Sequence, residues 1–350
     1  MSDFYIIRIL FFGAAAFIFT VFWTPLLSHF LYKYKMGKQI RNNGSTPIFS
    51  KMHNHKAGTP TMGGILIWGT TLIFSLFFFY IPKIFTFDFL INLNFLSRSE
   101  TLLPLGVLLA TAVVGLIDDW IDVRGKGLFG GGGLRVKHRL LIYAAISLVG
   151  AYWFFYKLNW DLFHVPFLGN FEVGWPYILI FIFVIVATAF SVNETDGLDG
   201  LAGGTLLIAF SAYGVIAFVL GKYDLASFCA VISGALLAFL WFNINPARFF
   251  MGDTGSMSLG ITLGVIAMLT NTALILPLIG LIFMVESLSV IIQLLSKKLR
   301  GGKKVFISSP IHHHFEAIGW PEPKIVMRFW VISGVSATVG LVVFLLDKTF

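Results

Sequence analysis

The sequence predicts an all-α polytopic membrane protein, organised as one transmembrane helical domain over residues 1–350. Two proportions lead to this class, because hydrophobic residues make up 57% of the chain and charged residues only 12%. Soluble domains carry about a quarter charged residues, so this chain lacks the charge that would cover a water-exposed surface. A third observation is that its apolar runs do not alternate with polar positions, as the strands of a membrane barrel would. Soluble enzymes, disordered chains and disulfide scaffolds are therefore excluded.

Ten segments are long and apolar enough to be candidate transmembrane helices, for which about 20 mostly apolar residues are needed. In order along the chain they are Phe4–Leu31, Met62–Ile81, Leu102–Ile117, Leu140–Phe155, Trp175–Val192, Leu201–Leu220, Leu225–Ile244, Met257–Thr270, Ala273–Leu295 and Ile325–Leu346. The eighth and ninth come from one apolar region, Ser256–Leu295, in which Glu286 is the only charged residue. We divide this region at Asn271-Thr272.

Basic residues are distributed unequally between the two sets of loops. The loops after the odd-numbered spans are residues 33–61, 118–139, 193–200, 245–256 and 296–324. Together with Arg328 they hold 19 of the 25 Lys and Arg residues. Because basic loops remain in the cytoplasm, this bias places these loops inside and both termini outside. The net charge of +8 then reflects loop orientation and anionic partners, and no nucleic-acid partner is expected.

Acidic residues gather in three short segments at span ends on the predicted cytoplasmic side. The segments are Gly115–Asp122, Asn193–Gly200 and Phe250–Ser256. All three reach about the same membrane depth, so a helical bundle could bring them together. Carboxylates near a low-dielectric boundary repel one another unless a cation neutralises them. Ligand sets made of oxygen atoms suit Mg²⁺ or Mn²⁺.

Basic residues surround these acidic segments. They are Lys33, Lys35, Lys38, Lys56, Lys137, Arg139, Arg248, Lys297, Lys298, Arg300, Lys303 and Lys304. A metal held by Asp and surrounded by Lys and Arg is the chemistry of a phosphate or diphosphate substrate. Simpler interpretations exist for each segment alone. Asp118-Asp119 could be a solvated helix end, Asp196 and Asp199 could cap the next span, and Lys297–Lys304 could be a topology signal that contacts anionic lipid. Three acidic span ends on one side favour the metal and phosphate site.

The last predicted cytoplasmic loop contains three consecutive histidines, in the segment Pro310-Ile311-His312-His313-His314-Phe315-Glu316. Neighbouring side chains on a helix diverge by about 100°, so the three cannot all ligate one metal ion. We interpret them as a patch that forms hydrogen bonds and contacts anions.

Five motifs follow one another in a characteristic order along the chain. They are Lys56–Gly64, Asp118-Asp119, Asn193–Ala202, Phe249–Ser256 and Pro310–Glu316. Together they resemble the phospho-N-acetylmuramoyl-pentapeptide-transferase family, a branch of the polyprenyl-phosphate N-acetylhexosamine-1-phosphate transferase superfamily. The resemblance extends over nearly the whole chain in span count, motif order and orientation. The Thr-Pro-Thr-Met-Gly-Gly and triple-His segments look like the muramoyl-pentapeptide branch rather than the GlcNAc-1-phosphate branch.

The resemblance implies an enzyme that transfers phospho-MurNAc-pentapeptide from UDP-MurNAc-pentapeptide to undecaprenyl phosphate, giving lipid I and UMP. This reaction belongs to peptidoglycan synthesis on the cytoplasmic face of the bacterial plasma membrane. The resemblance further implies Mg²⁺ as cofactor, with Mn²⁺ as an alternative, and a broken ninth span that forms a lipid groove. The sequence leaves the oligomeric state open, with a homodimer as one option.

The resemblance also implies roles for individual positions. Asp253 would be the Mg²⁺ ligand. Asp118, with Asp119 beside it, would be the catalytic base or, on another view, the nucleophile. The other catalytic positions would be Asp196, Asp199, His312 and His313. The substrate-binding positions would be Lys56, Thr61, Lys137, Asn193, Asn243, Phe250 and His314.

One position departs from the family pattern. Most members carry a basic residue four positions after the first Asp of the pair, where this chain has Asp122. Asp118 and Asp122 then share one helix face, which is closer to the GlcNAc-1-phosphate branch and puts in doubt how the diphosphate is neutralised. A sibling transferase for UDP-GlcNAc or another UDP-N-acetylhexosamine therefore stays open. A cation-coupled secondary transporter is the alternative from another class, disfavoured because Glu286 is the only clearly intraspan acid.

Overall fold

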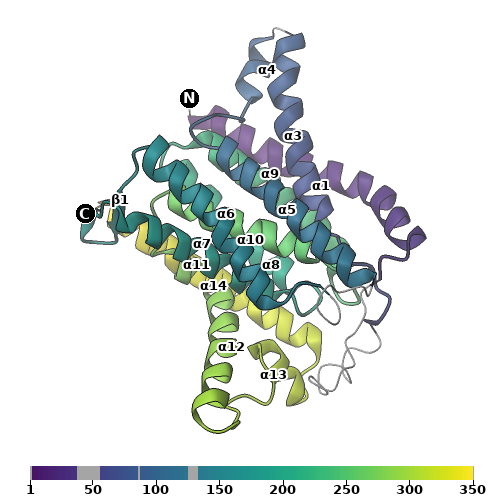
Figure 1. Ribbon diagram of the computed structural model, residues 1–350. Coiled ribbons are helices and arrows are strands. Elements are labelled where there is room, and N and C mark those ends of the chain that lie inside the picture. Colours follow the sequence, from purple (N-terminus) through teal and green to yellow (C-terminus); the bar gives the residue numbers. More distant parts are fainter. Residues whose placement is uncertain (1, 38–55, 86, 125–132, 350) are drawn as a thin grey trace.

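The computed structural model describes residues 2–37, 56–85, 87–124 and 133–349 (Figure 1), so that Lys38 lies outside the described residues. The chain forms a bundle of long helices. These are α1 (Ser2–Lys33), α3 (Ile65–Ile84), α4 (Asp88–Leu93), α5 (Leu102–Val123), α6 (Val136–Tyr152) with the π-helical turn η2 (Trp153–Lys157), α7 (Pro176–Thr195), α8 (Leu201–Val219), α9 (Tyr223–Asn243), α10 (Asp253–Leu269), α11 (Leu276–Ile279), α12 (Leu281–Leu299), α13 (Ile311–Ala317) and α14 (Glu322–Thr349). Strands β1 (Leu162–Val165) and β2 (Gly169–Glu172) form one antiparallel hairpin.

The predicted fold class, an all-α polytopic membrane protein, is confirmed. Within the described residues, eight helices are long and apolar enough to cross a membrane, namely α1, α3, α5, α6 with η2, α7, α8, α9 and α14. The two other predicted spans coincide with α10, which has 17 residues, and with the α11–α12 region. Ten spans in total, and their orientation in the membrane, stay predictions.

Helix α10 is the centre of the bundle. All of its residues from Thr254 to Leu269 are buried, and it packs against α5 on one side and α7 on another. Helix α9 packs against α1, α3 and α8. A helix that is apolar all round is covered by other helices rather than by solvent. The surrounding helices therefore fix the position of the first residue of α10, Asp253.

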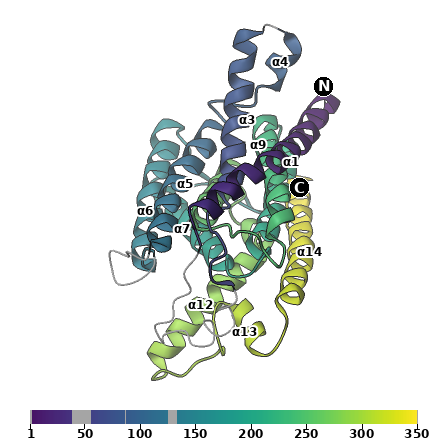
Figure 2. The same ribbon diagram turned by 90° about the vertical axis from the view of Figure 1, so that its right-hand side faces the viewer.

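The ninth predicted span is broken, as the resemblance implied. The predicted division at Asn271-Thr272 is confirmed, because α10 ends at Leu269 and Asn271 has a positive φ of 52°. Helix α11 ends at Ile279, and α12 begins at Leu281 and points away from the bundle (Figures 1 and 2).

Helix α12 has a polar inner side and an apolar outer side. Its buried residues include Glu286, Ser287, Ser289, Gln293 and Ser296. The outer side carries Leu288, Ile291, Ile292, Leu294, Leu295 and Leu299, all exposed. Polar groups of a membrane helix are least costly where they face other helices. The pattern therefore fits a helix with lipid on its outer side.

Several predicted span boundaries were wrong at the polar end of the bundle. Helix α5 continues past Ile117 to Val123, and α6 begins at Val136 instead of Leu140. The reason is that hydropathy marks the apolar part of a helix, whereas the hydrogen-bonded helix continues through polar residues beyond it. As a result, Asp118 and Asp119 lie on the last turns of α5, and Arg139 lies in the first turns of α6.

The β1–β2 hairpin, which the sequence did not predict, lies at the end of the bundle that holds both termini (Figure 1). His164 Nε2 on β1 is 2.6 Å from Asp347 Oδ2 near the end of α14. Near the start of α1, Arg8 Nη2 donates to Asp224 Oδ1 at 2.8 Å. Both termini thus share the end opposite to the predicted acidic segments, as an even number of spans requires.

Candidate active site

One guanidinium group joins three of the predicted site residues at the polar end of the bundle. Arg139 donates from Nε to Asp118 Oδ2 at 3.0 Å, from Nη1 to Asn193 Oδ1 at 2.9 Å, and from Nη2 to Asp253 Oδ2 at 2.6 Å. These residues come from the ends of α5 and α7 and the start of α10. The three acidic segments, far apart in sequence, therefore meet through Arg139, as their common membrane depth predicted.

The same cluster is tied together by further hydrogen bonds. Asn193 Nδ2 donates to Asp253 Oδ1 at 2.7 Å and to Ser256 Oγ at 2.9 Å. The backbone N–H of Leu134 donates to Asp118 Oδ1. Asp118 is fully buried, whereas Asp253 stays partly exposed, at 16% of its side chain. Charge-assisted hydrogen bonds of this kind are the strong ones, so Asp253 is held in one orientation, with part of its side chain exposed.

Asp119 performs a different task from Asp118. Its two carboxylate oxygens accept the backbone N–H groups of Asp253 and Thr254, each at 3.0 Å, and Thr61 Oγ1 lies 3.4 Å away. The first N–H groups of a helix lack intrahelical partners and carry partial positive charge. Asp119 therefore caps α10 from another helix. Gly252 must be glycine here, because its φ is +75° and a Cβ would lie 2.5 Å from Asp119 Oδ2.

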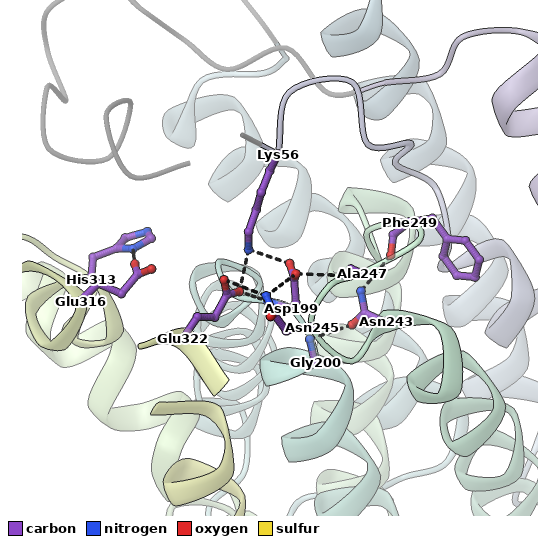
Figure 3. A network of polar contacts seen from close by, with 10 residues as sticks. All are labelled: Lys56, Asp199, Gly200, Asn243, Asn245, Ala247, Phe249, His313, Glu316 and Glu322. Atoms are coloured by element: carbon purple, nitrogen blue, oxygen red, sulfur yellow. Dashed lines mark hydrogen bonds and ion pairs between the residues drawn. The ribbon is translucent and has the colours of Figure 1, made fainter. Parts of the chain in front are cut away.

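A second polar cluster surrounds Lys56 (Figure 3). Lys56 Nζ contacts Asp199 Oδ1 at 2.7 Å and Glu322 Oε1 at 2.6 Å. Asp199 Oδ2 also accepts from Asn245 Nδ2 at 3.0 Å and from the Ala247 N–H at 3.1 Å. The interpretation of Asp199 as a helix cap is wrong, because the N-cap of α8 is Gly200 and has no side-chain cap bond.

Asn243, Phe250 and Thr61 shape the loops beside Lys56. Asn243 is buried, accepts the Gly200 N–H at 2.9 Å and donates to the Phe249 carbonyl at 2.8 Å. The half-buried Phe250 has its ring centroid 6.0 Å from Lys56 Nζ. Thr61 is buried next to Asp119. Lys56, Thr61, Asn243 and Phe250 thus lie around one region, as their shared predicted role requires.

The three histidines have different environments on α13. His312 is fully buried, and its Nδ1 lies 2.9 Å from Glu286 Oε2. His313 Nδ1 lies 2.6 Å from Glu316 Oε2, and His314 Nδ1 accepts the Ile307 N–H at 3.2 Å. Burial alone lowers the pKa of His312, but the carboxylates, Glu286 first, raise it above its ordinary value. The predicted hydrogen-bonding patch is present, and its contact with anions stays a prediction.

Two further predicted residues lie at the start of α6 and at the end of α7. Lys137 is exposed in the first turn of α6 and forms no hydrogen bond or ion pair with a described site residue. Asp196 is partly exposed at the end of α7, where its N–H donates to the Asn193 carbonyl at 3.3 Å. Sequence reasoning named Arg139 only among the surrounding basic residues and missed Glu322, whose sole signal is an acid at the predicted cytoplasmic end of a span.

Both clusters contain two carboxylates for each cation. Arg139 faces Asp118 and Asp253, and Lys56 faces Asp199 and Glu322. Among the residues that the structure describes, no three His, Cys, Asp or Glu side chains converge as a complete metal-binding set. Mg²⁺ is commonly bound by only one or two carboxylates together with water and substrate phosphates. Asp253, whose side chain is partly exposed, fits such a site.

The chain matches known protein families over most of the residues that form the Arg139 and Lys56 clusters. The model of glycosyl transferase family 4 matches residues 101–271, and signature 1 of phospho-N-acetylmuramoyl-pentapeptide-transferase matches residues 56–67. A phospho-N-acetylmuramoyl-pentapeptide-transferase of Chloroflexus aggregans is 38% identical over 346 residues, which is 95% of this chain and 89% of the relative. Its counterpart in Listeria monocytogenes serotype 4b is 41% identical over 333 residues, covering 94% of this chain and 96% of the relative.

The fold and the clusters define a polytopic membrane transferase of glycosyl phosphates. The relatives cover nearly the full length of the chain at 38% to 41% identity. The chain belongs to the phospho-N-acetylmuramoyl-pentapeptide-transferase family. Enzymes of this kind depend in general on a divalent cation. Neither a transporter nor a sibling transferase is favoured by these comparisons.

The cap formed by Asp119 generates a testable prediction. Asp119→Ala removes the acceptor of two N–H groups at the start of α10, so we expect a loss of about 1 to 2 kcal/mol in stability. Turnover should fall by up to roughly 10²-fold, because Asp253 is then no longer held in place. Asp119→Asn, which keeps one acceptor oxygen, should lie between this variant and the unmodified protein. The measurements are thermal unfolding in detergent and turnover, with the exposed Asp88→Ala as control. Lost turnover at an unchanged melting temperature would indicate a direct catalytic contact instead.

Proposed function

We propose that this protein transfers phospho-MurNAc-pentapeptide from UDP-MurNAc-pentapeptide to undecaprenyl phosphate, releasing UMP and forming lipid I. The observation that carries the proposal is the cluster in which Arg139 joins Asp118, Asn193 and Asp253 beside the Lys56 cluster. Phosphoryl transfer is catalysed mainly by positioned groups that stabilise charge. The arrangement supplies these groups at the end of a membrane bundle, where a water-soluble nucleotide and a lipid phosphate can meet.

The Lys56 cluster is the proposed nucleotide side of the site. A cation, a half-buried aromatic ring and several fixed polar groups suit a nucleotide, which presents phosphates and a flat base. Lys56 and Thr61 both fall within the matched family signature over residues 56–67. Nucleotide binding then has to compete with Asp199 and Glu322 for the ammonium group of Lys56, since both carboxylates contact it.

Asp253 is the proposed metal ligand. Its carboxylate projects from the N-terminus of the central helix, is partly exposed, and lies next to a second acid, Asp118, across Arg139. Mg²⁺ prefers hard oxygen donors, and Mn²⁺ accepts the same set. When bound, the cation would neutralise charge on the diphosphate. Arg139 contributes one positive charge at this place, which supports neutralisation of the diphosphate despite the acid at position 122.

The reaction exchanges one phosphorus–oxygen bond for another. An oxygen of the lipid phosphate attacks the sugar-bound phosphorus of the substrate, and the bond to the oxygen bridging the two phosphorus atoms breaks, with UMP as leaving group. Asp118 is the proposed base that takes the proton of the lipid phosphate, or, in a two-step variant, the nucleophile that carries the sugar phosphate between the two steps. Arg139 and Asn193 orient Asp118 and Asp253 relative to each other.

The substrate assignment is tested by direct comparison of nucleotide sugars. Purified protein in detergent is incubated with undecaprenyl phosphate, a divalent cation and either UDP-MurNAc-pentapeptide or UDP-GlcNAc, and UMP and lipid product are measured. We expect UMP and lipid I from the first substrate and turnover at least roughly 10²-fold lower with the second, because binding energy from the remote peptide serves catalysis. Comparable turnover with UDP-GlcNAc would make the sibling transferase the correct assignment.

The metal assignment makes a second prediction. Asp253→Asn should abolish turnover while the melting temperature changes little, because the amide keeps the shape of the side chain but lacks the charge that binds the cation. Asp161→Asn, at the opposite end of the bundle, is the control for removal of an acidic group. Turnover of the unmodified protein should cease in excess EDTA and return with Mg²⁺. Full turnover in EDTA would remove the metal from the proposed mechanism.

The role of Asp118 makes a third prediction. Asp118→Asn should lower kcat by roughly 10² to 10⁴, which is the usual contribution of a general base. Equilibrium binding of UDP-MurNAc-pentapeptide, measured by calorimetry, should change much less, since the Lys56 cluster is untouched. A kcat close to that of the unmodified protein would exclude Asp118 from the chemistry.

A further inference from the structure

Glu286 is a buried carboxylate that the proposed mechanism does not use. It lies on the inner side of α12 and is fully buried, and it is the only charged residue of its apolar region. Ionisable groups at such positions are costly and are usually paired. Its partner is His312, also fully buried, whose Nδ1 lies 2.9 Å from Glu286 Oε2. The pair connects the broken ninth span to the triple-histidine segment.

The second nitrogen of His312 faces the active-site side of the bundle. His312 Nε2 is buried and has no hydrogen-bond partner among the described residues. It points at Gly197, where an added Cβ would lie only 2.2 Å from Nε2. Gly197 belongs to the segment between Asp196 and Asp199, the latter a member of the Lys56 cluster. The imidazole therefore reaches this segment only because residue 197 has no side chain.

A carboxylate on one imidazole nitrogen decides what the other nitrogen can do. With Nδ1–H donated to Glu286, the ring orientation is fixed, and Nε2 carries a proton as well only when the ring is charged. A buried ion pair is weak as a source of stability, since apolar residues of similar volume serve as well or better. Packing alone thus gives no reason for the Glu286–His312 pair. Control of the direction and protonation of His312 Nε2 does give a reason for the pair.

We propose that Glu286 is a positioning residue of the transferase reaction, which holds His312 with Nε2 directed at the Asp196–Asp199 segment. From there the protonated ring, whose Nε2–H lies against Gly197, adds positive charge beside the diphosphate of the bound substrate. This inference rests on the proposed function and deepens it, because it adds a residue from inside a membrane span to the recognition of the diphosphate.

Several charged groups surround His312 and determine its protonation. Glu286 faces it from α12, Glu316 and His313 lie on its own helix, and Glu194 faces it from α7. The three carboxylates outweigh burial and raise the pKa of His312 above its ordinary value. Activity that requires the protonated ring is therefore present at low and neutral pH and is lost as the pH rises through the pKa of the folded protein.

The first test compares Glu286→Gln with Ser287→Ala over a range of pH. Glu286→Gln removes the charge that faces His312, so the alkaline limb of the kcat profile should move down by about one pH unit or more. Ser287→Ala is the matched control, because it removes a buried bond between α12 and Ser191 of α7 without touching His312. It should leave the alkaline limb in place. An unchanged limb in Glu286→Gln at a retained melting temperature would overturn the proposal.

A double variant separates positioning from general damage. If Glu286 acts through His312, then Glu286→Gln should cause no further loss of kcat in a His312→Asn protein. Multiplicative losses in the double variant would contradict the proposal.

A further variant keeps the test decisive if Glu286→Gln does not fold. Gly197→Ala displaces His312 without altering Glu286, and it should lower kcat by at least roughly tenfold. Gly106→Ala on α5, where an added Cβ meets no atom within 4 Å, is its control. Turnover of Gly197→Ala at the rate of the unmodified protein would overturn the inference. The unmodified protein is assayed in parallel with UDP-MurNAc-pentapeptide. If it forms no lipid I, the proposed function itself is wrong, and this outcome is distinct from a failure of the inference about Glu286.

Discussion

The polar end of this protein depends on how the central helix begins. Helix α10 is surrounded by other helices, so its first N–H groups cannot rely on solvent, and Asp119 of α5 accepts two of them. This contact joins α5 to the first turn of α10, which begins at Asp253. Because a buried helix end without partners is unfavourable, the cap and the position of the proposed metal ligand are one structural feature. The remaining site residues are arranged around it.

The site consists of two clusters, and each contains one basic side chain and two carboxylates. Arg139 connects the residues proposed for the phosphoryl chemistry, and Lys56 connects those proposed for the nucleotide. Each cation faces two carboxylates, so each cluster is one positive charge short of balance. A divalent cation at the first cluster would offset this deficit and leave one positive charge toward the negative charge of a diphosphate. Near a low-dielectric membrane such compensation is worth more than in water, which explains why the charges are concentrated here in a chain with so few of them.

The broken ninth span extends this arrangement into the membrane. Helix α12 turns apolar side chains outward and keeps polar ones inside, so Glu286 can face His312 from within an apolar segment. Gln293 lies two turns further along the same side of α12. Its amide oxygen accepts the backbone N–H groups of Val305 and Phe306. The polar side of α12 therefore supports the loop that leads to the histidines, while its apolar side is left for lipid.

The sequence by itself determined the membrane class, the helical segments and the end of the bundle at which the acids meet. Hydropathy and charge are properties of short segments, so they can be read without the fold. The resemblance added the family and a list of positions. In the structure Lys56 and Asn243 lie around Asp199 and Gly200, Asn193 bonds to Asp253, and Thr61 lies beside Asp119, while the roles of these residues stay predictions.

Only the tertiary structure decided which charge meets which. Lys137 and Arg139 are two residues apart on α6, so they face different sides of the helix, and Arg139 alone reaches the acids. Asp118 and Asp119 are neighbours whose side chains diverge by about 100°, so one binds Arg139 and the other caps α10. Glu322 lies 266 residues from Lys56 along the chain. Partners so distant are chosen by the packing of whole helices, which no local pattern of residues records.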